Sequence, residues 1–132
     1  MMDSSTGMLL RLLFVAFLWG ISNPLIKVGS VGVESIKRSD AMRQVLAQIA
    51  FLVTSLRFIV PFLLNQIGSV LFVIILGDAD LSVAVPFVNA LSLVITAITG
   101  LMLGEKLNRV SVLGMSLVVS GVSVCTYASR TA

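Results

Sequence analysis

Residues 81–128 read LSVAVPFVNALSLVITAITGLMLGEKLNRVSVLGMSLVVSGVSVCTYA, and this stretch decides the fold. It holds two apolar runs, 81–103 and 110–128, which are joined by the short polar segment GEKLNR at 104–109. Each run is close to the roughly 20 residues with which an α-helix crosses about 30 Å of hydrocarbon, and so short a connection allows only a tight antiparallel return. The stretch therefore predicts a transmembrane helical hairpin.

Two further apolar runs precede the hairpin, at 8–28 and 58–76. The composition agrees with a chain that is solvated by lipid, because 58% of residues are apolar, 11% are charged and the mean hydropathy is +1.10. The four runs occupy most of the 132 residues and leave no room for a soluble head. We therefore expect an all-α fold, a four-helix transmembrane bundle that forms a single domain over 1–132.

The first run has an alternative interpretation as a secretory signal peptide, since small residues at Gly20 and Ser22 would suit cleavage. Two observations favour a retained helix. The region before the run carries Asp3 and no cluster of positive charge, and the run continues past Ser22 as far as Lys27.

The long first loop has its own pattern, because apolar residues recur at three- and four-residue spacing over 40–56. This pattern predicts an amphipathic helix. With Lys37 and Arg38 just before it, the helix suits the membrane interface, with its apolar stripe among acyl chains and its cations near phosphate. Packing on its own bundle is the alternative.

The basic residues predict the orientation, because cytoplasmic loops carry an excess of Lys and Arg. One side of the predicted bundle holds Lys27, Lys37, Arg38, Arg43, Arg57, Lys106 and Arg109. The other side holds Arg11 and Arg130, beside Asp3, Asp78 and Asp80. We therefore expect both termini outside the cell or in a lumen. The net charge of +3 reflects this asymmetry. The Lys and Arg residues form no basic stripe typical of nucleic-acid binding, so we expect no nucleic acid as a partner.

Amide side chains lie in three of the four predicted spans, where lipid offers them no hydrogen-bond partner. They are Asn23, Asn65, Gln66 and Asn89. Such residues either join helices through hydrogen bonds, at roughly 1 kcal/mol each, or line a polar path for a solute. Trp19 lies near the middle of the first span, away from the interfacial belts, where it would wall such a cavity or pack between helices.

A proline lies near each of these amide positions, at Pro24, Pro61 and Pro86. Each proline removes one helical donor and frees a carbonyl in the preceding turn. The freed carbonyls and the amides would together form a polar patch of the kind that broken transporter helices use, and a simple packing kink is the alternative.

Two other sets of residues have predicted partners. Glu105 lies at the same depth as Lys27 and Arg57, which would permit an ion pair with either, and snorkelling of the cations to the headgroups explains the three residues equally well. Small residues that permit close helix contact mark the last two spans, where they would join the hairpin or a dimer. They are Ser92, Thr96, Gly100, Gly104, Gly114 and Gly121.

The chain has few side chains suited to catalysis or metal binding. It contains no His, a single Cys and no Asp or Glu inside a predicted span except Glu105 at a helix end. We therefore expect no metal site, no cofactor and no enzymatic activity. The lone thiol of Cys125 fits a small apolar residue in the last span.

The motif LGEKL at 103–107, with Gly114 and Gly121 in the last span, resembles the C-terminal half of the drug/metabolite transporter superfamily, which includes small multidrug resistance proteins and EamA domains. Trp19-Gly20 and Lys27 resemble the EamA opening. The pattern PFLLNQ at 61–66, together with residues 80–89, resembles the transmembrane protein 234 family over nearly the whole chain. The resemblance implies a four-helix, multi-pass protein with a transport role and an open substrate.

One position departs from the small multidrug resistance pattern. Those proteins carry a proton- and drug-binding glutamate eight residues before a lysine, and the corresponding position before Lys27 is Trp19. Proton-coupled cation export therefore does not carry over. We expect instead a homodimer or hetero-oligomer in the lipid bilayer that transports a small polar solute along its amides. The alternative is a non-transporting structural or accessory membrane subunit.

Overall fold

The computed structural model describes residues 4–131, and it contains five α-helices and one short 3-10 helix. They are α1 (Ser4–Gly29), η1 (Val33–Ser35), α2 (Ala41–Thr54), α3 (Leu56–Leu76), α4 (Leu81–Met102) and α5 (Arg109–Thr131). Two residues used to predict the orientation in the membrane, Asp3 and the side chain of Arg130, lie outside the described part of the structure. Four helices, α1, α3, α4 and α5, are long and apolar enough to cross a membrane, which confirms the predicted all-α fold.

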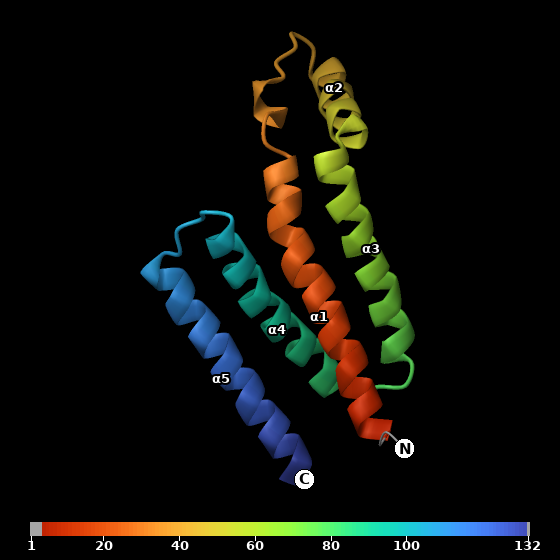
Figure 1. Ribbon diagram of the computed structural model, residues 1–132, viewed down its shortest axis with the longest axis vertical. Coiled ribbons are helices and arrows are strands. Elements are labelled where there is room, and N and C mark those ends of the chain that lie inside the picture. Colours follow the sequence, from red (N-terminus) through yellow and green to blue (C-terminus); the bar gives the residue numbers. More distant parts are fainter. Residues whose placement is uncertain (1–3, 132) are drawn as a thin grey trace.

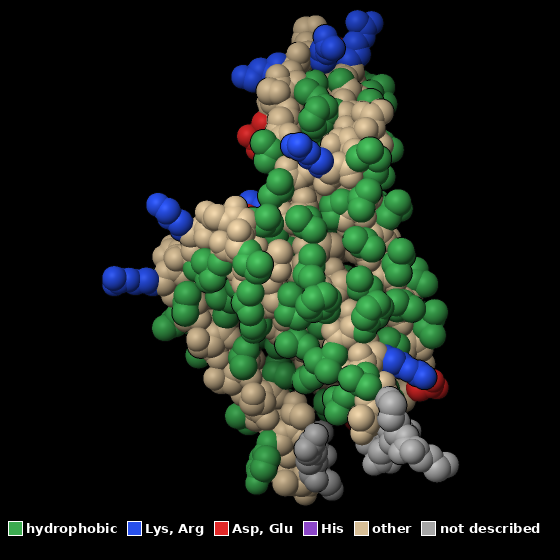
Figure 2. All heavy atoms as spheres, in the orientation of Figure 1, with side chains coloured by type: hydrophobic (Ala, Val, Ile, Leu, Met, Phe, Trp, Pro, Cys, Tyr) green, Lys and Arg blue, Asp and Glu red, His purple; other side chains and the backbone are tan. Residues whose placement is uncertain are grey.

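The bundle is arranged around α1, which lies between α3 and α4, while α5 packs on the outer side of α4 (Figure 1). The two ends of the described chain lie at the same end of the bundle as the α3–α4 connection. Lys and Arg side chains gather at the opposite end, around α2 and the α4–α5 turn, and a broad apolar surface separates the two ends (Figure 2). This banding is what a membrane-spanning protein requires.

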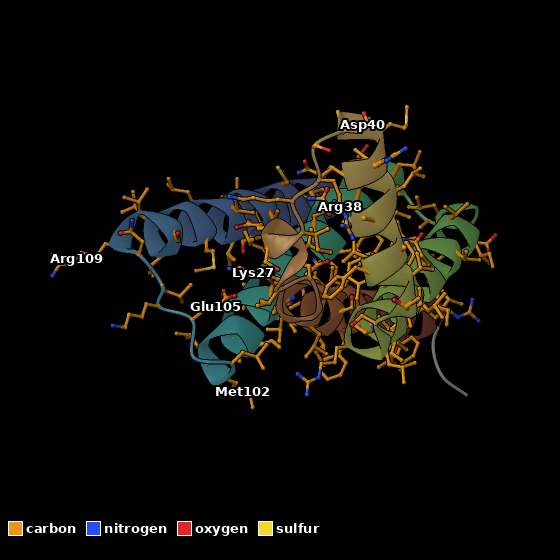
Figure 3. All side chains as sticks on the ribbon, turned by 90° about the horizontal axis from the view of Figure 1, so that it is seen from above. Lys27, Arg38, Asp40, Met102, Glu105 and Arg109 are labelled. Atoms are coloured by element: carbon orange, nitrogen blue, oxygen red, sulfur yellow. The ribbon has the colours of Figure 1, made fainter. Side chains whose placement is uncertain are left out.

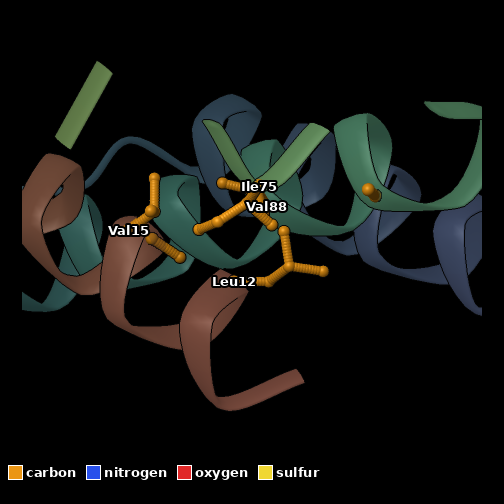
Figure 4. Close-up of a cluster of buried hydrophobic side chains, with 6 residues drawn as sticks. Leu12, Val15, Ile75 and Val88 are labelled. Atoms are coloured by element: carbon orange, nitrogen blue, oxygen red, sulfur yellow. The ribbon is translucent and has the colours of Figure 1, made fainter. Parts of the chain in front are cut away.

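The buried hydrophobic core lies where α1, α3 and α4 meet, near the end that holds the N-terminus. The buried cluster comprises Leu12, Val15, Ala16, Ile75, Ala84 and Val88 (Figure 4). Val15 and Val88 are fully buried. Because lipid tails are as apolar as these side chains, the cluster holds the helices together through close van der Waals contact rather than through expulsion of water.

At the other end of α1, its backbone touches that of α3. A Cβ atom on Gly29 would collide with the main-chain carbonyl of Arg57. That carbonyl lies four residues before Pro61, which has no N–H to bond it, so the proline frees a polar group just where α1 comes closest. Only a residue without a side chain permits this approach.

The predicted amphipathic segment forms α2, which lies across the end of the bundle instead of continuing α3 (Figure 3). Ser55 separates the two helices in an extended conformation. The half-buried residues of α2 include Gln44 and Gln48, whereas Met42 and Leu46 on its apolar stripe are more than half exposed. The helix therefore turns most of its apolar stripe away from the described chain, although Leu52 is half-buried.

The hairpin of the last two spans is looser than its small residues suggested. Ser92 and the neighbouring turn of α4 pack on Gly20 of α1 instead of on α5. Within the described chain, a Cβ atom added to Gly114 or Gly121 would meet nothing within 4 Å. The small-residue face of α4 therefore serves contact with α1, because the central helix offers the deeper packing surface.

Gly104 was expected on the packing line of the α4 region, but it lies beyond the helix and ends it. Its φ of 88° is left-handed. The N–H of Glu105 bonds the carbonyl of Gly100 at 2.9 Å, and the N–H of Gly104 bonds that of Leu101 at 3.0 Å. This is the Schellman arrangement, which favours glycine at the left-handed position.

Candidate functional site

The candidate site is centred on Asn65 of α3. Its Nδ2 donates to Ser22 Oγ at 2.8 Å and to Asn23 Oδ1 at 3.0 Å, both in α1. Ser22 is buried and Asn65 is half-buried, whereas Asn23 is exposed. The two helices therefore share a polar cluster within their spans that reaches from the packed interior to the surface of the chain.

Trp19 completes this cluster one turn away. Its Nε1 donates to the main-chain carbonyl of Asn65 at 3.2 Å, and Ser69 Oγ donates to the same carbonyl at 3.1 Å. The indole packs on Gly68 and meets the ring of Phe72 edge to face, with 5.1 Å between centroids. Trp19 is half-buried, so it packs between α1 and α3 and forms one side of the amide cluster.

The other two predicted amides do not join the cluster. Asn89 is exposed, and its Nδ2 donates to the carbonyl of Val85 in its own helix at 2.9 Å. Gln66 is also exposed, and it makes no side-chain hydrogen bond among the described residues. The predicted set of four thus divides into a bonded pair, Asn23 and Asn65, and two separate surface amides.

The three prolines lie inside helices that remain continuous, and they bear differently on the site. Pro24 is buried directly after Asn23, and Pro61 is buried one turn before Asn65. Pro86 follows Val85, whose carbonyl accepts the amide of Asn89. Each proline therefore lies close to an amide, but only the first two flank the polar cluster.

An ion pair lies at the end of the bundle, beyond the cluster. Lys27 Nζ is 2.9 Å from Glu105 Oε1, which joins the end of α1 to the turn after α4, and the two side chains lie together in Figure 3. Arg57, the other predicted partner, forms no salt bridge within the described chain. The Lys27 side chain is 72% exposed, so solvent and headgroups screen the pair strongly.

Ser22 was not among the predicted site residues. It lies next to Asn23, and a serine in a transmembrane helix gives no signal of its own, because its hydroxyl can bond its own helix as Ser22 Oγ does to Trp19 O at 3.3 Å.

No group of three or more His, Cys, Asp or Glu that could hold a metal ion occurs in the part of the chain described.

Comparison with known proteins identifies the family. A family profile described as "Putative transmembrane family 234" matches residues 12–126, which include the whole amide cluster and most of every span. The chain belongs to transmembrane family 234. This finding confirms the resemblance that the motifs at 61–66 and 80–89 indicated.

Two relatives in family 234 cover most of the chain. A transmembrane protein 234 homolog of Dictyostelium discoideum is 41% identical over 118 residues, which span 89% of this chain and 92% of the relative. A homolog of Anopheles gambiae is 38% identical over 117 residues, with 88% and 84% covered. No solved structure matches the chain significantly.

Proposed function

We propose that this member of transmembrane family 234 moves a small, polar, uncharged solute across a membrane, along a path lined by amide side chains and formed between chains. The observation that carries the proposal is the exposure of Asn23, Gln66 and Asn89, each on a different spanning helix. An N–H or C=O group that faces hydrocarbon without a partner costs several kcal/mol, and this applies to the amide of Gln66 and to the amide atoms of Asn23 and Asn89 that their described bonds leave free. Water or another protein surface is therefore expected to cover these positions.

The cluster around Asn65 gives such a path a polar wall. Both hydrogen bonds of this amide use its Nδ2, and the described hydrogen bonds leave its Oδ1 free to accept one from a solute. Asn23 Oδ1 accepts from Asn65 and keeps its own Nδ2 as a donor. An acceptor and a donor side by side suit hydroxyl or amide groups on an uncharged solute.

No charged side chain is buried among the described residues, and this restricts the solute further. No Asp or Glu lies within α1, α3, α4 or α5 as described, and Glu105, in the turn after α4, is paired with Lys27. Trp19 stands where small multidrug resistance proteins have their proton-carrying glutamate, and its ring packs on Gly68 and Phe72. A cationic drug would therefore find no counter-charge, and the proposed similarity to drug/metabolite transporters concerns architecture and not proton coupling.

A homodimer or hetero-oligomer is part of the proposal. Within one chain α3 and α4 pack on α1 and α5 packs on α4, and the exposed amides lie on the outside of that arrangement. A second chain is the simplest partner that would enclose them with water.

A structural role is the second candidate, and a specific observation favours it. The bonds from Asn65 to Ser22 and Asn23 link two helices directly, which is how amides hold membrane bundles together. Under this alternative the protein would be a non-transporting accessory subunit, and Gln66 would have no role.

Gln66 separates the two candidates, because it makes no described hydrogen bond and its loss should not weaken the fold. The test measures uptake of radiolabelled sugars, polyols and small amides into proteoliposomes that contain wild type, Gln66→Leu or the matched control Ile67→Leu. We expect uptake of at least one solute above protein-free liposomes, a several-fold loss in Gln66→Leu and no change in Ile67→Leu. Uptake no greater than in empty liposomes, or an unaffected Gln66→Leu protein, would refute the proposal.

A further inference from the structure

An apolar groove runs between α4 and α5, and none of its lining residues belongs to the amide cluster. One half, with a volume of about 480 Å³, lies toward the α4–α5 turn and is lined by residues that include Leu101, Leu107 and Val112. The other half, of about 590 Å³, lies toward the chain end and reaches Tyr127. Val94 and Val119 line both halves, so the two form one continuous groove.

The serine and threonine hydroxyl groups that line this groove already donate hydrogen bonds within α5. Ser116, Ser120, Ser123 and Thr126 each donate to the carbonyl four residues earlier in α5, at 2.7–2.9 Å. With these donors satisfied inside the helix, the groove presents mainly methyl and methylene groups along about 22 Å of α5 between Val112 and Tyr127, at 1.5 Å per residue. A flexible hydrocarbon chain fits this shape and chemistry.

Two cations stand at the turn end of the groove, on either side of the lining residue Leu107. Lys106 and Arg109 are exposed, and neither forms a salt bridge within the described chain, because Glu105 is paired with Lys27. Arg109 extends away from the bundle in Figure 3, and Figure 2 shows cationic side chains projecting at this turn. The positive end of the α5 dipole lies at the same place.

We infer that the α4–α5 groove binds an anionic phospholipid, with the phosphate between Lys106 and Arg109 and an acyl chain along the half of the groove lined by Leu101 and Val112. The two features are independent, since one concerns the shape and polarity of the hairpin and the other concerns charge at its mouth. Together they select a molecule with a negative head and an apolar tail. A zwitterionic lipid would fill the groove without using the charge.

The test uses the full chain in detergent and native mass spectrometry, which counts the lipids that remain bound. The probes are phosphatidylglycerol and phosphatidylcholine with identical acyl chains, and glycerol 3-phosphate as a soluble headgroup. We expect phosphatidylglycerol to bind in clear preference to phosphatidylcholine and glycerol 3-phosphate not to bind. Each of Lys106→Gln and Arg109→Gln should lower the affinity for phosphatidylglycerol roughly fivefold, the effect of about one cation at a membrane surface.

Matched variants separate this site from ordinary annular lipid. Val119→Trp fills the middle of the groove, whereas Val118→Trp places the same ring on a neighbouring residue of equal type and similar exposure, 42% against 40%, outside the lining. We expect lipid to be lost from Val119→Trp and retained by Val118→Trp. Lys37→Gln/Arg38→Gln removes two cations at the same end of the bundle and should leave binding unchanged.

Several outcomes would overturn the inference. Equal binding of the two lipids would show that the cations do not select the headgroup. Equal loss from the two Trp variants, or from Lys37→Gln/Arg38→Gln, would indicate general surface association. A dimer that dissociates on Val119→Trp would assign the groove to a second copy of the chain. Lys106→Gln and Arg109→Gln change exposed residues only, so they keep the test decisive if Val119→Trp fails to fold.

Discussion

Asn65 of α3 donates a hydrogen bond of 2.8 Å to Ser22 of α1, and this bond joins a half-buried amide to a fully buried hydroxyl inside the bundle. A second bond from the same nitrogen reaches Asn23 at 3.0 Å. The amide therefore ties two spanning helices together whether or not a solute passes beside it.

Replacing Asn65 with Leu should destabilise the folded chain by about 1–2 kcal/mol, because two interhelical bonds worth roughly 0.6–1 kcal/mol each are lost. Asn89→Leu is the matched control, since that amide bonds only its own helix, and it should change stability little. The measurement is unfolding of each purified protein in mixed micelles by increasing denaturing detergent. Equal midpoints for the two variants would show that the Asn65 bonds contribute nothing.

Gly29→Ala should destabilise by about 1–3 kcal/mol or more, as overpacking does, because the new methyl group would strike the carbonyl of Arg57 rather than a side chain that can turn aside. Gly114→Ala adds the same methyl group where nothing lies within 4 Å, and it should be nearly neutral. Thermal unfolding of both proteins in one detergent checks the difference. If Gly29→Ala unfolded at the wild-type temperature, the result would contradict the close contact between Gly29 of α1 and the backbone of α3.

The ion pair between Lys27 and Glu105 should contribute no more than about 1 kcal/mol, since both side chains are accessible to solvent. A double-mutant cycle with Lys27→Gln and Glu105→Gln measures the coupling free energy. We expect this coupling to shrink as ionic strength rises from about 0.01 to 1 M, over which the Debye length falls from about 30 to 3 Å. A coupling of several kcal/mol that salt does not change would instead indicate a desolvated pair.

The distribution of Lys and Arg predicts that the α4–α5 turn faces the cytoplasm and that both chain ends lie on the opposite side. Glycosylation acceptor sequons placed at the C-terminus and, separately, in the turn at 104–108 test this in microsomes. We expect modification of the C-terminal site and none in the turn, and the reverse pattern would invert the orientation.

Much of the fold could be predicted from local pattern. The hairpin at 81–128 and the helix expected over 40–56 follow from the length and periodicity of apolar residues, and the structure places α4, α5 and α2 there with ends displaced by at most three residues. The ends differ because capping decides them. Gly104 ends α4 through its left-handed backbone, and Ser55 separates α2 from α3.

The candidate site was less accessible to prediction. Four amides on three helices were identifiable as polar groups in lipid, but the sequence did not indicate that Asn65 would meet Asn23 while Asn89 would turn to its own helix. Ser22 had no distinguishing pattern. Whether two side chains on different helices touch depends on how each helix is rotated about its axis and where the two cross, and neither quantity is encoded in a single segment.

The sequence by itself determined that this chain is a multi-pass membrane protein with four spans and an amphipathic helix, because bilayer thickness and helical periodicity act on each segment separately. Its residues also match the profile of transmembrane family 234 over 12–126. Only the tertiary structure decided that α1 is central, that Lys27 pairs with Glu105 and that α5 leaves a groove against α4. The physical reason is that these relationships come from fitting all the helices together at once. The close approach that Gly29 and Gly20 permit draws α3 and α4 onto α1 and leaves α5 at the edge.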